Sequence, residues 1–106
     1  IGGGVIGLEF ASIFNAFGSK VTVVEYCKEI LPAFDRDIAK RLRTSLKKQG
    51  INFKTGCAVS AIRNEADGKV VEYIEKETTK QEVCDLVLMA VGRGANLPSL
   101  NLDDIA

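Results

Sequence analysis

The chain has 106 residues, 46% of them hydrophobic and 26% charged, which is the size and composition of one globular domain. Fourteen basic residues balance fourteen acidic ones, so no net charge attracts nucleic acid or an anionic membrane, and no apolar run is long enough to cross a bilayer. There is no histidine, the commonest metal ligand and general base, so we expect no metal and place any acid–base chemistry elsewhere.

The glycines at the start of the chain are followed by an apolar stripe. Gly2, Gly3, Gly4 and Gly7 come first, and apolar residues then recur at intervals of three and four, which predicts a helix that Gly18 ends. The members of the stripe are Ile6, Phe10, Ile13, Phe14 and Phe17. The β-branched residues that follow predict a buried strand over 20–25 and then a loop over 26–34.

A second helix is predicted to begin at Asp35, a good N-cap residue, and to end at Gly50. Its apolar stripe is Ile38, Leu42 and Leu46. Its basic residues, between 40 and 48, fall largely on other sides, which favours a solvated face over a nucleic-acid site. A third strand is expected over 51–54, so the order glycine loop, helix, strand, helix, strand predicts a parallel sheet.

The pattern then changes to short extended segments. These cover about 58–63, 70–75 and 81–84, with a tight turn at Asp67-Gly68, and they predict an antiparallel meander. Residues 86–91 form a continuous apolar run, which predicts a strand buried on both faces and ending at Gly92. Residues 93–106 are expected to be a polar exit segment.

The glycine pattern Gly2-x-Gly4-x-x-Gly7 matches the fingerprint of dinucleotide-binding loops. Its glycines permit a tight turn, close approach of pyrophosphate and close helix packing, and the helix that follows directs free amides at the phosphates. Glu25 lies eighteen residues after Gly7, where an acidic residue binds the adenosine ribose hydroxyls and repels a 2′-phosphate. We therefore expect NAD(H) to be preferred to NADP(H); the alternative is that Glu25 is a solvated strand end.

Two features remain open from the residues alone. Glu9 is expected in the first helical turn, where the dipole favours a carboxylate, so capping alone could account for it. Such a glycine loop normally follows a strand of about five residues, but only Ile1 precedes it here. We therefore expect a truncated first strand and a longer parent protein.

The chain resembles the flavoprotein disulfide reductases over essentially its whole length. The motifs that carry the resemblance are 2–12 (GGGVIGLEFAS, a GxGxxGxE motif), 14–25 (FNAFGSKVTVVE), 30–35 (ILPAFD) and 91–93 (VGR). The resemblance implies an α/β, Rossmann-like FAD/NAD(P)-binding three-layer domain: a small parallel sheet with helices, plus an antiparallel β-meander. Residues 1–106 would be the NAD-binding domain of a larger FAD-containing enzyme.

The resemblance also implies roles for individual residues. Gly2, Gly4, Gly7 and the amides of Val5 and Ile6 would hold the pyrophosphate of NAD; Glu25 would bind the adenosine ribose and Val59 would lie beside the adenine; Glu9 and Gly92 would contact the nicotinamide end. NADP-dependent relatives carry arginines where this chain has Tyr26 and Pro32, and Lys28 alone would be a poor phosphate clamp. Arg93 would contact either the cofactor or the flavin domain.

The resemblance is strongest to the dihydrolipoamide dehydrogenases, which oxidise dihydrolipoamide with NAD⁺ through FAD. It implies a cytoplasmic homodimer whose partners are its own FAD-binding and dimerisation domains and a 2-oxo acid dehydrogenase complex. The chain departs from the family at 94–96, and it lacks the redox-active Cys-x4-Cys pair and the His-Glu dyad, so we expect no catalytic residue in it. Its cysteines, Cys27, Cys57 and Cys84, have no paired spacing and are expected to be ordinary reduced thiols.

Several alternatives share the same evidence. The chain could be the same domain of an NADH oxidase, a coenzyme A-disulfide reductase, a mercuric reductase or a transhydrogenase. It could also be a nucleotide-binding module without catalysis. A Cys-x4-Cys pair in the parent sequence would favour the dehydrogenase, whereas a lone redox cysteine would favour the oxidase or the coenzyme A enzyme.

Overall fold

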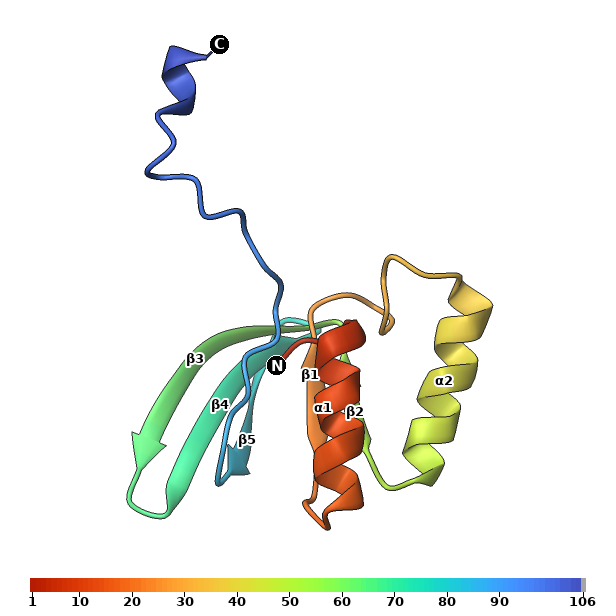
Figure 1. The fold of residues 1–106 in the computed structure, drawn as a ribbon. Helices are drawn as coiled ribbons and strands as arrows, with labels where there is room; N and C mark the ends of the chain where they lie inside the picture. Colours follow the sequence, from red (N-terminus) through yellow and green to blue (C-terminus); the bar gives the residue numbers. More distant parts are fainter. Residues whose placement is uncertain (106) are drawn as a thin grey trace.

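The computed structural model describes residues 1–105, which fold into two helices packed on a parallel sheet and a separate antiparallel sheet (Figure 1). The elements, in chain order, are α1 (Val5–Ala16), β1 (Thr22–Glu25), α2 (Arg36–Lys48), β2 (Asn52–Thr55), β3 (Cys57–Glu65), β4 (Gly68–Glu75), β5 (Thr78–Cys84) and the 3₁₀ helix η1 (Leu102–Asp104). The expected α/β class is confirmed, as are both helices and the strand that follows each of them.

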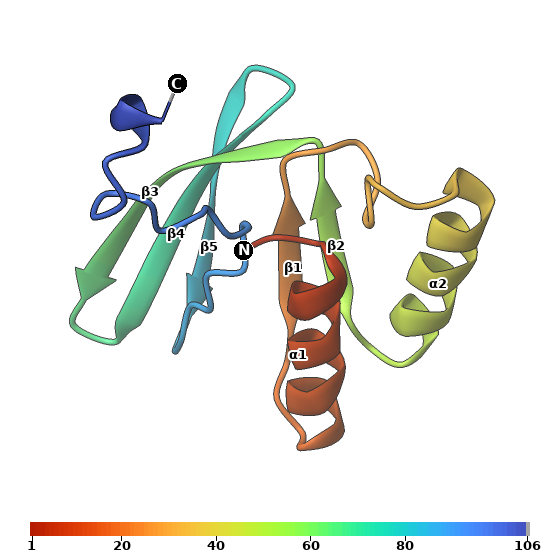
Figure 2. The same ribbon diagram turned by 45° about the horizontal axis from the view of Figure 1, so that its top comes forward.

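The parallel sheet that contains β1 is the layer between the helices and the meander. β1 pairs in parallel with β2, and its side chains alternate between the two faces. Val23 packs in a core with residues of both helices and of the loop after β1, while Val24 packs in a second core with Cys57 and Tyr73 of the meander. Figure 2 shows the meander beside this sheet, so the three-layer arrangement that the resemblance implied is present.

The meander has the strand order β3-β4-β5, with antiparallel pairing throughout. Its strands are longer than the sequence pattern predicted, because polar residues occupy the exposed ends where alternation is weak. The first turn is at the expected Asp67-Gly68, and Gly68 has a φ of +141°. The second turn is formed by Lys76 and Glu77, which both have positive φ, as a tight hairpin turn requires.

The predicted helix ends are confirmed. The Asp35 side chain accepts a hydrogen bond from the amide of Asp37 at 2.9 Å and so caps α2. Gly18 and Gly50 follow the two helices with φ of +98° and +103°, the left-handed conformation that glycine adopts without a steric penalty.

The apolar stripes are not the main buried faces of the helices. On α1 the buried residues are Gly7, Leu8 and Ala11, whereas all five members of the stripe are at least 41% exposed. On α2 only Leu46 of the stripe is buried, and it is joined by Ala39. Small residues on the inner face of α1 allow close approach to the glycine loop and β1, so the bulky side chains are on the outside, where Phe10 and Phe14 stack.

The prediction of a strand over 86–91 is wrong within the described residues. The segment is extended but forms no sheet ladder, and Leu86, Met89 and Val91 are 81%, 58% and 68% exposed. Among the described residues its sheet-like hydrogen bonds go to Ile1 alone: the Ile1 amino group donates to the Leu88 carbonyl, and the Ala90 amide donates to the Ile1 carbonyl. A buried strand needs neighbours along its whole length, and within residues 1–105 only one residue, Ile1, pairs with this segment.

Over 93–105 the expected exit segment is confirmed as exposed chain that leaves the body of the fold (Figure 1), and residue 106 of that prediction lies outside the described residues. It is irregular from 92 onward except for η1. Within the described residues, no helix combines the length and apolar character needed to span a membrane.

We predict that Leu46→Ala lowers the free energy of unfolding by about 2–5 kcal/mol, because the substitution leaves a cavity in the core below α2. The matched control is Leu42→Ala, one turn earlier on the same helix and 36% exposed, which should cost clearly less. Urea unfolding followed by circular dichroism measures both. Equal losses would contradict the orientation of α2.

Candidate functional site

The glycine loop lies at the carboxyl end of β1, and two of its glycines are required by contacts with backbone. Gly2 has a φ of +106°, and a Cβ there would lie 2.2 Å from the Ala90 carbonyl oxygen. A Cβ on Gly7 would lie 2.1 Å from the Gly2 carbonyl oxygen. The loop, the start of α1 and the 86–91 segment therefore pack backbone to backbone, which accounts for these two fingerprint positions.

Gly4, by contrast, is not required by any contact with the backbone. It is the N-cap of α1, where no side chain caps the helix, and the space around its missing Cβ is empty to 4 Å. The amides of Val5 and Ile6 donate to no protein acceptor within residues 1–105, and both residues are nearly half exposed. The helix start thus offers free N–H groups and a positive dipole end beside an open surface, the arrangement that binds phosphate.

Glu25, the last residue of β1, is buried at the edge of this surface. It is 8% exposed, and both carboxylate oxygens accept backbone hydrogen bonds. Oε2 accepts from the Gly3 amide at 2.5 Å, and Oε1 accepts from the Cys27 amide at 2.8 Å. Glu25 is therefore not a solvated strand end. Because a carboxylate offers about four acceptor positions, it retains the capacity to accept two further hydrogen bonds.

The structure adds residues that the sequence pattern did not identify. Gly3 is held on both sides, because its carbonyl accepts from the Leu31 amide at 2.9 Å while its amide donates to Glu25. Ile30 is fully buried against Gly3, and Leu31 has a φ of +49°. No propensity rule predicts a leucine in the left-handed region, so the loop after β1 was expected only as a connection.

The other expected site residues are spread around the loop. Gly92 is two residues beyond Ala90, which lies against Gly2 and Gly7. Gly92 itself is exposed, with a φ of +130°, and the space around its missing Cβ is empty to 4 Å. Val59 is partly buried against the second core, and that packing alone can account for an apolar residue there.

Glu9 is exposed, but it does not cap the helix. α1 begins at Val5, so Glu9 is the fifth helical residue, and the first turn contains no acidic side chain. The expectation that Glu9 lies in the first turn is therefore wrong, and the dipole gives no reason for a carboxylate at this position.

The three cysteines are free thiols with little nucleophilic character. Burial, together with the neighbouring Glu25 carboxylate, raises the pKa of Cys27. Burial is also the main reason that the pKa of Cys57 and the pKa of Cys84 are raised, with further contributions from Glu75 and from Asp85 respectively. A raised pKa reduces the thiolate fraction at neutral pH, as expected for ordinary packing thiols.

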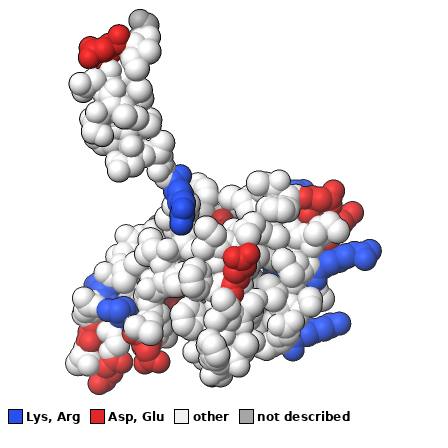
Figure 3. Space-filling model, viewed as in Figure 1, with Lys and Arg blue, Asp and Glu red and all other residues white. Residues whose placement is uncertain are grey.

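The basic side chains do not gather at the glycine loop. Figure 3 shows basic groups over α2 at one side of the molecule, over the meander at the other side and at the base of the exit segment, with mostly uncharged surface over α1. A hollow of about 560 Å³ lies elsewhere: Lys20 and Thr22 line it at the opposite, amino end of β1, together with Lys54 and Glu82. We regard the glycine loop as the site because a dinucleotide binds along an open loop and helix start, and the hollow has no comparable set of fixed donors.

Comparison with known proteins identifies the family. The sequence profile of the pyridine nucleotide-disulphide oxidoreductases matches residues 1–105. The chain belongs to this family. It is 44% identical to a dihydrolipoamide dehydrogenase of Chaetomium thermophilum, over 99% of this chain and 21% of that protein, and 46% identical to a dihydrolipoyl dehydrogenase of Acholeplasma laidlawii, over 94% and 29%. The chain therefore spans between a fifth and a third of the length of these relatives.

Solved structures agree with this assignment. The HOCl-induced flavoprotein disulfide reductase RclA of Escherichia coli is 38% identical, with a TM-score of 0.81 over 98% of this chain and 23% of that one. The water-forming NADH oxidase of Lactobacillus brevis, solved with NADH, has a TM-score of 0.77 over 86% of this chain and 20% of that one. At 22% identity the oxidase shows a shared fold alone.

We predict that Gly7→Ala destabilises this oxidoreductase domain strongly, whereas Gly4→Ala costs only about 0.5–1 kcal/mol, because a helix N-cap prefers glycine to alanine. The first substitution forces a methyl group against the Gly2 backbone; the second adds a methyl group to open space at a φ of −80°, which alanine adopts without strain. Thermal unfolding by circular dichroism compares the two. A Gly4→Ala variant as unstable as Gly7→Ala would contradict the loop geometry.

Proposed function

We propose that the chain is the NAD(H)-binding domain of an FAD-dependent dihydrolipoamide dehydrogenase. The free amides at the start of α1 would bind the pyrophosphate, and Gly4, which lacks a side chain, would let the phosphates approach the backbone. Val59 would lie beside the adenine, and Glu9 and Gly92 would contact the nicotinamide end. FAD would be bound by the parent enzyme's own flavin domain.

The single observation that carries the preference for NAD(H) is the fixed carboxylate of Glu25. Its two backbone hydrogen bonds hold it beside the glycine loop, with acceptor capacity left for the two hydroxyls of the adenosine ribose. A 2′-phosphate in the same place would meet a buried negative charge. The nearby Tyr26 is 77% exposed, and Lys28 is the cation nearest to Glu25 in sequence, so this loop contains no pair of cations to bind a 2′-phosphate.

In the intact enzyme, this domain would hold NAD⁺ beside the flavin while dihydrolipoamide is oxidised to lipoamide. Two electrons and a proton would reach the nicotinamide as a hydride by way of FAD, and one proton would be released. The chain's own contribution would be binding and orientation, because none of its thiols is activated. The redox-active disulfide, the dimerisation domain, and any contact with a 2-oxo acid dehydrogenase complex would belong to other parts of that enzyme, which we expect to be a cytoplasmic homodimer.

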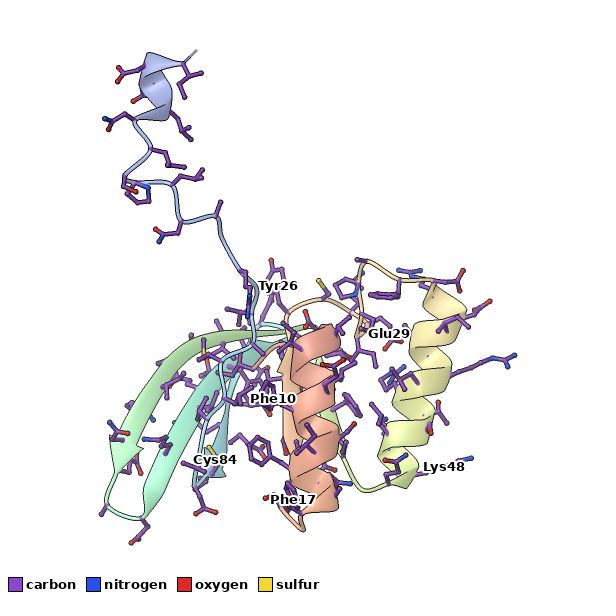
Figure 4. The ribbon with its side chains drawn as sticks, in the orientation of Figure 1. Phe10, Phe17, Tyr26, Glu29, Lys48 and Cys84 are labelled. Carbon is purple, nitrogen blue, oxygen red and sulfur yellow. The ribbon has the colours of Figure 1, made fainter. Side chains whose placement is uncertain are left out.

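The exposed apolar surface supports the proposal of a longer parent protein. Phe17 is 83% exposed and Leu86 is 81% exposed, and together with Phe10, Phe14 and Met89 they present more large apolar groups than a free surface usually carries. Figure 4 shows Phe10 beside the upper half of α1 and Phe17 at its lower end. A strand paired with 86–91 and a domain packed on α1 would cover these groups.

We predict that the chain binds NADH at least tenfold more tightly than NADPH, since the 2′-phosphate replaces a favourable hydrogen bond with charge repulsion. Titration calorimetry of the same protein sample with both nucleotides measures the ratio, and the two ligands differ only in that phosphate. Equal affinities, or a preference for NADPH, would overturn the role given to Glu25; no binding of either would overturn the proposed function.

A further inference from the structure

The loop after β1 is joined to α2 by a partly buried ion pair. The Arg43 guanidinium contacts the Glu29 carboxylate, whose side chain is only 13% exposed. Nη2 donates to Oε2 at 3.0 Å, while Nε lies 2.8 Å from Oε1 without pointing its hydrogen at that oxygen. Glu29 also accepts from the amide of Ile30 at 3.0 Å. Figure 4 shows Glu29 between α1 and α2, so the pair fixes the loop to the second helix.

Ile30 and Leu31, which follow Glu29, connect this ion pair to the glycine loop. Ile30 is fully buried, and Leu31 is held at a φ of +49°, a left-handed conformation that is unfavourable for leucine. Such strain persists only where the surroundings fix the conformation. Here Glu29, held by Arg43, and the buried Ile30 fix it. The result is that the Leu31 amide points at the Gly3 carbonyl, 2.9 Å away.

This hydrogen bond determines the direction of a phosphate-binding amide. The peptide between Gly3 and Gly4 is planar and trans, because the structure contains no cis peptide in the described residues. The carbonyl and the N–H of a trans peptide point in opposite directions, so a Gly3 carbonyl held toward Leu31 turns the Gly4 N–H away from the loop. That N–H then lies at the start of α1 with the free amides of Val5 and Ile6.

We propose that Arg43 is a positioning residue for dinucleotide binding. It acts through Glu29, the strained Leu31 and the Gly3 carbonyl, and it sets the orientation of the Gly4 amide without contacting the nucleotide itself. The inference rests on the proposed NAD(H) site. It adds a residue of α2 to a site that the sequence pattern confined to the glycine loop and Glu25.

The test compares NADH affinity in Arg43→Gln, Arg43→Lys and Arg41→Gln. Arg41→Gln is the matched control, because it removes the same charge from the same helix at an exposed position. Binding is titrated by NADH fluorescence at a temperature where circular dichroism shows each variant fully folded. Arg43→Gln should weaken NADH binding roughly fivefold, Arg43→Lys should weaken it less because the charge is kept, and Arg41→Gln should not change it.

A role in folding alone would lower the melting temperature of Arg43→Gln and leave the affinity of the folded protein unchanged, and that result would overturn the inference. If Arg43→Gln does not fold, Arg43→Lys decides: an affinity equal to that of the unaltered chain would overturn it. Failure of the unaltered chain to bind NADH would instead overturn the proposed function. A positioning role also predicts that NMR spectra of the free Arg43 variants show shifted amide signals at Gly4 and Val5.

Discussion

The carboxylate of Glu25 is the contact on which the glycine loop depends. It ends β1, the strand between the two cores, and it accepts from the amides of Gly3 and Cys27. One buried charge therefore fixes both the glycine loop, which we propose binds the phosphates, and the chain that leaves the strand. Burying a carboxylate is costly unless hydrogen bonds stabilise it, and both of its oxygens are bonded here. The same group that would select the nucleotide thus also organises the site.

The arrangement at the loop is held by backbone more than by side chains. Gly2 and Gly7 are packed against carbonyl oxygens, and the Gly3 carbonyl accepts a hydrogen bond from the amide of Leu31, which has a positive φ. Backbone contacts move less than side chains do, which suits a site that must keep its amide donors fixed before the ligand arrives. Gly4 is different, since nothing fills the space around it.

Much of this architecture could be predicted from local sequence, because its signals are local. The N-cap at Asp35, the glycines that end the helices and the turn at Asp67-Gly68 each depend on neighbouring residues, and the structure contains them all. The position of Glu25 at the end of a buried strand could likewise be predicted from the sequence. Its backbone partners could not, because they depend on how two loops meet in space.

Two of the errors have a common physical origin, because burial depends on which parts of the chain meet in space. Periodicity shows which residues share a helix face, but it does not show which face meets the sheet, so the bulky stripe of α1 proved to be exposed while Leu8 and Ala11 are buried. The apolar run at 86–91 indicated a buried strand, yet burial depends on neighbours, and within residues 1–105 only Ile1 pairs with it. Glu9 falls outside the first turn because the helix begins at Val5.

The most direct test of the account is where the nucleotide binds. Two-dimensional ¹⁵N NMR spectra recorded while NADH is added should show the largest changes at the amides of Gly4, Val5 and Ile6 and at Cys27, with little change at Thr22 or Asn52. Changes centred on Thr22 and Asn52, in the hollow at the amino end of β1, would contradict the account and place binding away from the glycine loop.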